Sequence, residues 1–130
     1  MVQISRTPNI PYWGGTALAG RNISEDFKAL VERIGKATFT TPTHTAVSIG
    51  AATTVVLAAN ANRLYALLIN DSDAIIYIKL GASAVLNQGI RLNASGGSYE
   101  MGEKVGNLYL GAINGITAVA GKNLLVTEGV

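Results

Sequence analysis

Two aliphatic runs separated by a polar tetrapeptide make up residues 63–80, which read RLYALLINDSDAIIYIKL. The first run, residues 63–69, and the second, residues 74–80, each have the length and composition of a strand. The tetrapeptide Asn70-Asp71-Ser72-Asp73 is rich in side chains that hydrogen-bond their own backbone in turns. This stretch therefore predicts two strands joined by a hairpin-type turn.

The same alternation of short strands and turn residues continues through most of the remaining chain. Asn114-Gly115, the dipeptide most typical of a two-residue hairpin, is predicted to join two of the strands. Asn87-Gln88-Gly89 predicts a bulge or bend. The further predicted strands cover residues 46–50, 53–58, 85–92, 96–101, 107–113, 116–120 and 124–127. About eight or nine strands at roughly ten-residue spacing predict an all-β fold, an antiparallel β-sandwich of jelly-roll-like type.

Residues 1–43 have a different composition and are predicted to form an N-terminal arm and one short helix, ahead of a β-sandwich domain at 44–130. The helix is predicted over about residues 24–35, with Ser24 as its N-cap and Gly35 as its stop. Glu25 and Asp26 then lie in the first turn, where the helix dipole favours anions. A three-turn helix is too short to be stable alone, so its apolar stripe needs a partner.

The arm, residues 1–22, carries the only tryptophan of the chain in the sequence Tyr12-Trp13-Gly14-Gly15. An indole ring is costly to leave in water. Two interpretations stay open: the aromatic pair lies on a neighbouring subunit, or it packs on the sandwich of its own chain. The candidate interface residues are therefore Tyr12 and Trp13 of the arm, with Phe27, Leu30, Val31 and Ile34 of the helical stripe.

Composition excludes several classes of function. A chain of 130 residues fits one domain, and the absence of cysteine excludes disulfides, thiolate catalysis and zinc–thiolate sites. The ten basic side chains are scattered and the net charge is only +2, so no nucleic-acid partner is expected. No segment resembles a signal peptide or a membrane span, and no membrane partner is expected. Only 14% of residues are charged, which indicates surfaces that a protein partner covers.

Three groups of residues were weighed as chemical sites. Asn70, Asp71 and Asp73 resemble half of a calcium loop but lack a closing carboxylate, which favours a turn. Glu100 and Glu103 flank Gly102 in a predicted loop and are interpreted as solvated charges rather than a general acid and base. His44, in a threonine-rich run, is interpreted as polar surface. No catalytic residue, cofactor or metal site is predicted.

Several motifs resemble those of small β-sandwich virion proteins of tailed bacteriophages, of the head decoration (cement) type. They are RLYALLINDS (63–72), IYIKLG (76–81), NQGIRL (87–92), LVTEG (125–129), PYWGGT (11–16) and FKAL (27–30). The resemblance implies a non-enzymatic subunit that is made in the host cytoplasm, resides in the virion and stabilises the head by bridging capsomers. Its implied partners are the major capsid protein or other virion proteins, and copies of itself, with a trimer favoured.

Two alternative functions remain open at this point. One is a tail, baseplate or fibre-associated structural subunit with the same fold. The other is a carbohydrate-binding β-sandwich module, because such domains stack sugars on exposed aromatic rings. The aromatic residues available for that role are Tyr12, Trp13, Tyr65, Tyr77, Tyr99 and Tyr109.

Overall fold

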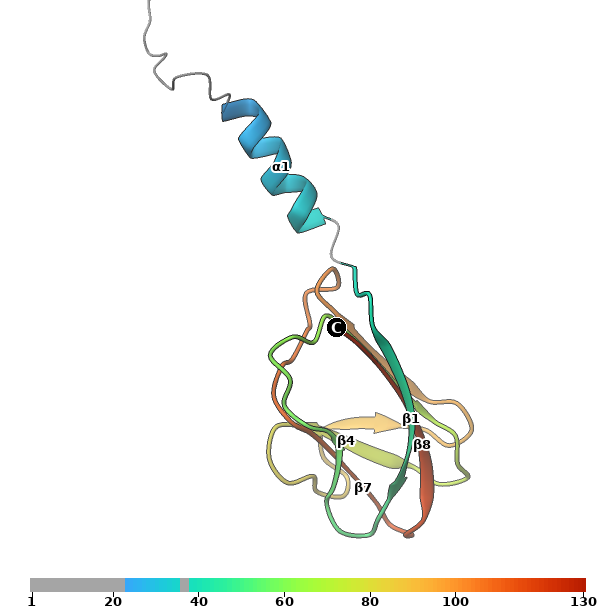
Figure 1. Cartoon of the computed structure of the whole chain (residues 1–130). Helices are drawn as coiled ribbons and strands as arrows, with labels where there is room; N and C mark the ends of the chain where they lie inside the picture. The colour runs from blue at the N-terminus through green and yellow to red at the C-terminus, as the bar shows by residue number, and fades with distance from the viewer. Residues whose placement is uncertain (1–22, 36–37) are drawn as a thin grey trace, which may run out of the picture. The chain divides into compact units, whose positions relative to one another are not determined.

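The computed structural model describes residues 23–35 and 38–130. The chain divides into two compact units, residues 1–36 and residues 37–130. The elements are α1 (Ile23–Gly35), β1 (Pro42–Ile49), β2 (Thr54–Leu57), β3 (Tyr65–Asn70), β4 (Ile76–Leu80), β5 (Ile90–Leu92), β6 (Ser98–Gly102), β7 (Ile113–Thr117) and β8 (Lys122–Gly129) (Figure 1). The predicted combination of one short helix and a mostly β chain is confirmed.

Helix α1 has the apolar side chains that its sequence predicted on one face. Glu25 and Asp26 occupy its first turn. The helix begins at Ile23, so Ser24 lies inside the first turn and the prediction that it caps the helix from outside is wrong. Ile23, Phe27 and Leu30, spaced to share a face, are 67%, 65% and 51% exposed. These three side chains therefore give α1 an exposed apolar face.

The eight strands of residues 37–130, called here the two-sheet unit, form two four-stranded sheets. The first sheet has the order β1-β8-β3-β6 and the second has the order β2-β7-β4-β5. Every neighbouring pair is antiparallel. The pairs are nested, because β1 pairs with β8, β2 with β7, β3 with β6 and β4 with β5. Only the β4–β5 connection therefore stays within one sheet, and each of the others passes between the sheets.

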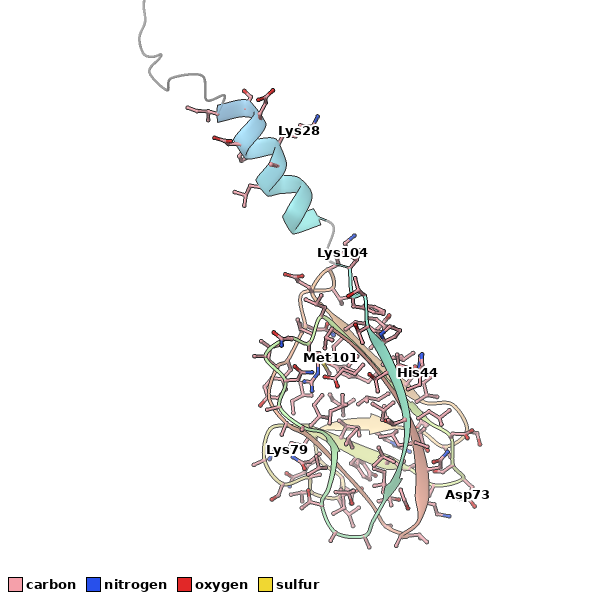
Figure 2. All side chains as sticks on the ribbon, in the orientation of Figure 1. Lys28, His44, Asp73, Lys79, Met101 and Lys104 are labelled. Atoms are coloured by element: carbon pink, nitrogen blue, oxygen red, sulfur yellow. The ribbon has the colours of Figure 1, made fainter. Side chains whose placement is uncertain are left out.

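One hydrophobic cluster draws side chains from both sheets. Met101 and Ile49 of the first sheet and Ile78 of the second are fully buried in it. Figure 2 shows Met101 in the interior, whereas His44 on β1 projects away from it. The other members are Val56, Leu57, Ala66, Leu68, Ile76, Leu92, Ile113, Leu124 and Val126. Most of these side chains come from alternate positions along their strands, as expected where each sheet buries one face; the exception is Val56 and Leu57 on β2, where the register with β7 shifts.

The predicted hairpin at residues 70–73 is wrong, because β3 and β4 belong to different sheets. The side chain of Asn70 explains the path of this turn. Its amide nitrogen donates to the carbonyl oxygens of Ala74 at 2.7 Å and Leu92 at 3.0 Å, and its Oδ1 accepts from the Ser72 amide at 3.1 Å. Asn70 is fully buried, so these bonds tie the turn to the end of β5 rather than to a hairpin partner.

The predicted hairpin at Asn114-Gly115 is also wrong, since both residues lie within β7. Gly115 faces the core, where a Cβ atom would lie 3.1 Å from Val56 Cγ2 and 3.3 Å from Ile78 Cδ1. The Asn114 amide points the other way and donates to the carbonyl oxygens of Gly81 and Ala82. Glycine at position 115 is therefore explained by close packing in the core, and asparagine at position 114 by its hydrogen bonds to the loop that follows β4.

Three predicted strand boundaries also change. Residues 107–112 form no strand; the carbonyl oxygens of Tyr109 and Gly111 accept from Arg63, which replaces a strand partner. Only residues 90–92 of the predicted strand at 85–92 are extended, because Asn87 has φ 63° and starts a turn. Strand β1 begins at Pro42, ahead of the predicted domain start at His44.

Candidate functional site

The register of the first sheet places three rows of side chains on the face that points away from the core. One row is His44, Thr127, Leu67 and Glu100, and the next is Ala46, Leu125, Ile69 and Ser98. The third is Pro42, Gly129, Tyr65 and Gly102. These residues alternate with the core residues of the same strands, so they share the outer surface. We call this surface the open face.

The centre of the open face is apolar. Ala46, Ile69 and Leu125 border a shallow hollow of about 420 Å³. Leu125 is 39% exposed. Beside them, His44 Nδ1 and Thr127 Oγ1 are hydrogen-bonded at 3.0 Å, so the threonine hydroxyl holds the imidazole against the sheet. His44 lies ahead of the first predicted strand, 46–50, whereas in the structure it belongs to β1 and to this surface.

An aromatic pair occupies one end of the open face. The rings of Phe39 and Tyr65 lie with centroids 5.2 Å apart and planes inclined by 21°. Phe39 rests directly on Gly129, where the Cβ atom of any other residue would collide with its ring. Tyr65 is flanked by Gly102 and Gly129 on the neighbouring strands. The glycines therefore make room for two rings on the sheet, a pairing the sequence reasoning did not find.

The polar rim of this aromatic pair contains the two glutamates that the sequence singled out. The Tyr65 hydroxyl donates to Glu100 Oε2 at 2.7 Å. This hydrogen bond, together with partial burial and the charge of Glu100, raises the pKa of Tyr65 above its ordinary value. Glu100, Glu103 and Lys104 line a hollow of about 240 Å³ beside the rings. The structure thus brings both glutamates to the aromatic pair.

Part of the outer face of the second sheet is covered by the chain itself, although Val55 on β2 is 59% exposed. The loop between β4 and β5, residues 81–89, crosses this face. The Ala84 amide donates to Thr53 Oγ1 at 2.9 Å, and the Tyr77 hydroxyl donates to Asn87 Oδ1 at 2.7 Å. Ile116, which points away from the core cluster, is only 8% exposed. The two sheets therefore differ: a loop crosses part of the outer face of the second sheet, whereas the hollow bordered by Ala46, Ile69 and Leu125 lies open on the first.

A buried ion pair, missed by the sequence reasoning, holds the loops at one end of the two-sheet unit. Arg63 Nε donates to Glu128 Oε2 at 2.8 Å, and the guanidinium is fully buried. Its other nitrogens donate to the carbonyl oxygens of Tyr109 and Gly111, and to that of Ala58 at 2.6 Å. The only sign of this buried ion pair in the sequence is that Arg63 directly precedes the apolar run at residues 64–69.

The acidic turn at residues 70–73 has its side chains engaged with neighbouring residues. Lys122 Nζ donates to Asp73 Oδ1 at 2.6 Å, and Asn123 Nδ2 donates to Asp71 Oδ2 at 3.3 Å. The hydrogen bond and the charge of Lys122 lower the pKa of Asp73. Across residues 23–35 and 38–130, no three histidine, aspartate or glutamate side chains gather as a metal site would require.

The structure describes only some of the residues that the sequence predicted to form an interface. Phe27 and Leu30 are exposed on α1. Tyr12 and Trp13, and the side chains of Val31 and Ile34, lie outside what the structure describes. Of the other tyrosines, Tyr99 and Tyr109 pack against the core cluster, and the Tyr77 hydroxyl donates to Asn87 in the 81–89 loop.

No family model, curated protein or solved structure matches this chain. Within the described residues no helix has the length and hydropathy of a membrane span, and α1 has only 13 residues.

Proposed function

We propose that the two-sheet unit is a jelly-roll sandwich. The nested pairs are those of one long antiparallel hairpin of eight strands, in which β1 and β8 are the open ends and β4 and β5 the closed end. The additional pairs β3–β8 and β4–β7 are what rolling this hairpin into two sheets produces. A jelly roll is the eight-stranded architecture of many viral capsid and lectin domains.

We propose that the protein is a non-enzymatic virion subunit that decorates and stabilises the head of a tailed bacteriophage by bridging capsomers. The observation that carries this proposal is the difference between the two sheets. The chain covers part of the second sheet with its own loop, whereas on the first sheet Ala46, Ile69 and Leu125 together border an open hollow. A contiguous apolar area on a sparsely charged domain favours contact with a protein surface.

The helix supports a second contact in the same assembly. Ile23, Phe27 and Leu30 give α1 an exposed apolar face. A helix of this length needs such a face to be buried if it is to persist. We propose that α1 joins copies of the chain, with a trimer as the favoured assembly, while the open face contacts the major capsid protein or other virion proteins.

The test uses heads of the phage that encodes this chain, produced without it. Added wild-type protein is expected to co-sediment with these heads and raise their melting temperature. Leu125→Lys, at the centre of the open face, is expected to abolish both effects, because it places a cation in the apolar contact. Val55→Lys is the matched control, since Val55 is an exposed strand residue of the second sheet.

Two outcomes would overturn the decoration proposal. One is that wild-type protein fails to co-sediment with heads, or sediments instead with tails, which would favour the tail or baseplate function. The other is that Leu125→Lys binds heads as well as Val55→Lys does. Circular dichroism of each variant confirms that a loss of binding does not come from unfolding.

A second candidate function, carbohydrate binding, is favoured by the aromatic pair and its rim. Phe39 and Tyr65 offer ring surface for a sugar, and Glu100 and Lys104 beside them offer hydrogen-bonding groups. Titration with chitohexaose and maltohexaose, followed by NMR, tests it. Tyr65→Ser is expected to abolish any shifts if the site is used, whereas Tyr77→Ser on the other sheet should not. Absence of shifts with the wild-type protein counts against this function.

A further inference from the structure

Strand β1 is an edge strand that lacks the features by which edge strands usually avoid pairing. It has eight residues, PTHTAVSI, whereas the other edge strands β6, β2 and β5 have five, four and three. It contains no charged residue, and it is exposed at six positions: Pro42, Thr43, His44, Thr45, Ala46 and Ser48. Natural edges are usually short or carry charges, because unpaired backbone groups bind other strands.

The hydrogen-bonding pattern shows which backbone groups of β1 are free. Thr41 and Val130 exchange both of their backbone hydrogen bonds, at 3.1 and 3.2 Å. In an antiparallel pair such residues alternate with residues whose groups point away. The register continues with Pro42 opposite Gly129 and Thr43 opposite Glu128. The amides that point away from β8 therefore belong to every second residue, namely His44, Ala46 and Ser48. The carbonyl groups of the same residues point to the same side.

We infer that this edge pairs with β1 of a second copy of the chain, antiparallel and centred on Ala46. A two-fold axis at Ala46 places Ala46 opposite Ala46 and His44 opposite Ser48. Each of the three free amides on one copy then meets a free carbonyl on the other, giving six main-chain hydrogen bonds. The free donors and acceptors of β1 are thus matched by those of a second copy, and the uncharged side chains that the two-fold arrangement brings together argue for this partner.

The side chains on this edge fit the same arrangement. His44, Ala46 and Ser48 lie on the open face, and the pairing brings two small alanine side chains together at the centre. No charged group on β1 meets a like charge across the axis. The row Ala46, Leu125 and Ile69 would continue into the same row of the second copy, doubling the length of the apolar strip. The β1 edge is therefore a two-fold contact.

This inference does not rest on the proposed virion function, because the pairing is measured on the full-length protein without heads. It is also compatible with a trimer formed through α1. In that case the β1 edge of each copy would join neighbouring trimers, and the mass in solution would be that of six chains instead of two.

The first experiment compares the mass of the wild-type protein with that of Ala46→Pro by sedimentation velocity over a concentration series. Proline removes the central amide and places its ring in the pairing edge. It is tolerated at edge positions whose amide faces solvent, so the monomer should fold. The expected result is that the variant has half the mass of the wild type, with association weakened about 100-fold. Ala46→Val, which keeps the amide, is the control and should associate like the wild type.

A second pair of variants keeps every backbone group and guards against misfolding. Ala46→Asp and Ala46→Lys each place like charges opposite one another at the two-fold axis. Each variant alone is therefore expected to have half the mass of the wild-type protein. Mixed in equal amounts, they are expected to recover the wild-type mass, because opposite charges then meet. Recovery on mixing is a result that a damaged fold could not produce.

Four results would overturn the inference. The wild-type protein could remain a monomer throughout the concentration series. The Ala46→Pro variant could have the same mass as the wild type, or the charged variants could fail to recover it on mixing. Finally, hydrogen exchange could show the His44, Ala46 and Ser48 amides protected in a monomer, which would mean that the chain's own residues pair with the edge. Loss of head binding by Leu125→Lys tests the virion function separately.

Discussion

Replacing Arg63 with methionine tests how strongly the two-sheet unit depends on one buried cation. The guanidinium is fully buried and donates to four acceptors. These are Glu128 Oε2 at 2.8 Å and the carbonyl oxygens of Tyr109 at 2.7 Å, Gly111 at 3.1 Å and Ala58 at 2.6 Å. They belong to strand β8 and to both loops at that end, so the substitution removes a connection among three segments.

The expected cost follows from what the substitution leaves behind. Methionine fills most of the volume, so the cavity is small, but Glu128 loses its cation and the carbonyl groups lose their donors. Removing one partner of a buried ion pair costs about 3–5 kcal/mol. Asn60 Nδ2 still donates to Glu128 at 2.9 Å and the carboxylate is 18% exposed, which places the cost near the lower value, about 3 kcal/mol. For a unit of this size that corresponds to a fall in Tm of roughly 12–24 °C.

Urea unfolding followed by circular dichroism measures this loss. The matched control is Lys122→Met, which breaks the Lys122–Asp73 pair at 2.6 Å; Asp73 is largely exposed, so the unfolding midpoint should stay close to that of the wild type. The double variant Arg63→Met/Glu128→Leu should recover part of the loss, because no unpaired carboxylate remains. A loss below about 1 kcal/mol in Arg63→Met, with an unchanged m-value, would refute the argument.

Three further substitutions test other parts of the two-sheet unit. Asn70→Asp puts carboxylate oxygen where the amide nitrogen now donates to Ala74 and Leu92, and should cost about 3 kcal/mol in urea unfolding; a cost under about 1 kcal/mol would contradict the assigned bonds. Because the folded-state pKa of Tyr65 is raised, the stabilisation from its bond to Glu100 is present below pH 10.0 and is lost as the pH rises through the folded pKa. Absorbance titration should show one late phenol that titrates earlier in Glu100→Gln, and identical curves would argue against the bond. Gly89→Ala should cost about 1–3 kcal/mol, because Gly89 has φ 85° and its Cβ would collide with the Ile78 carbonyl; Gly96→Ala, with φ 114° and open space, should cost less in the same assay.

Local sequence patterns predicted the elements of this protein well where they depend on neighbouring residues. The stripe containing Phe27 and Leu30 predicted a helix with one apolar face, and the aliphatic runs within residues 63–80 predicted two strands. Both patterns arise within a few residues, from the geometry of one helical turn or one pleat. The candidate interface on α1 could be predicted from the sequence for the same reason. The open face could not, because its residues come from four strands that are distant in the sequence.

The pairing of strands was decided by contacts that no short pattern contains. The turn residues at 70–73 specify a change of direction, but buried Asn70 binds the end of β5, and this directs β4 into the second sheet. Asn114-Gly115 favours a hairpin locally, yet the core beside Gly115 leaves no room for a side chain and β7 runs straight through. Burial against distant strands outweighs a local turn preference.

The sequence by itself determined that this chain is mostly short strands with one amphipathic helix, because those properties depend on spacing along the chain. Only the tertiary structure decided that Pro42 lies opposite Gly129, that Phe39 rests on that glycine beside Tyr65, and that β1 is an edge. Each of these depends on bringing together residues from distant parts of the chain. The energy that selects them comes from a core shared by both sheets and from hydrogen bonds between distant strands.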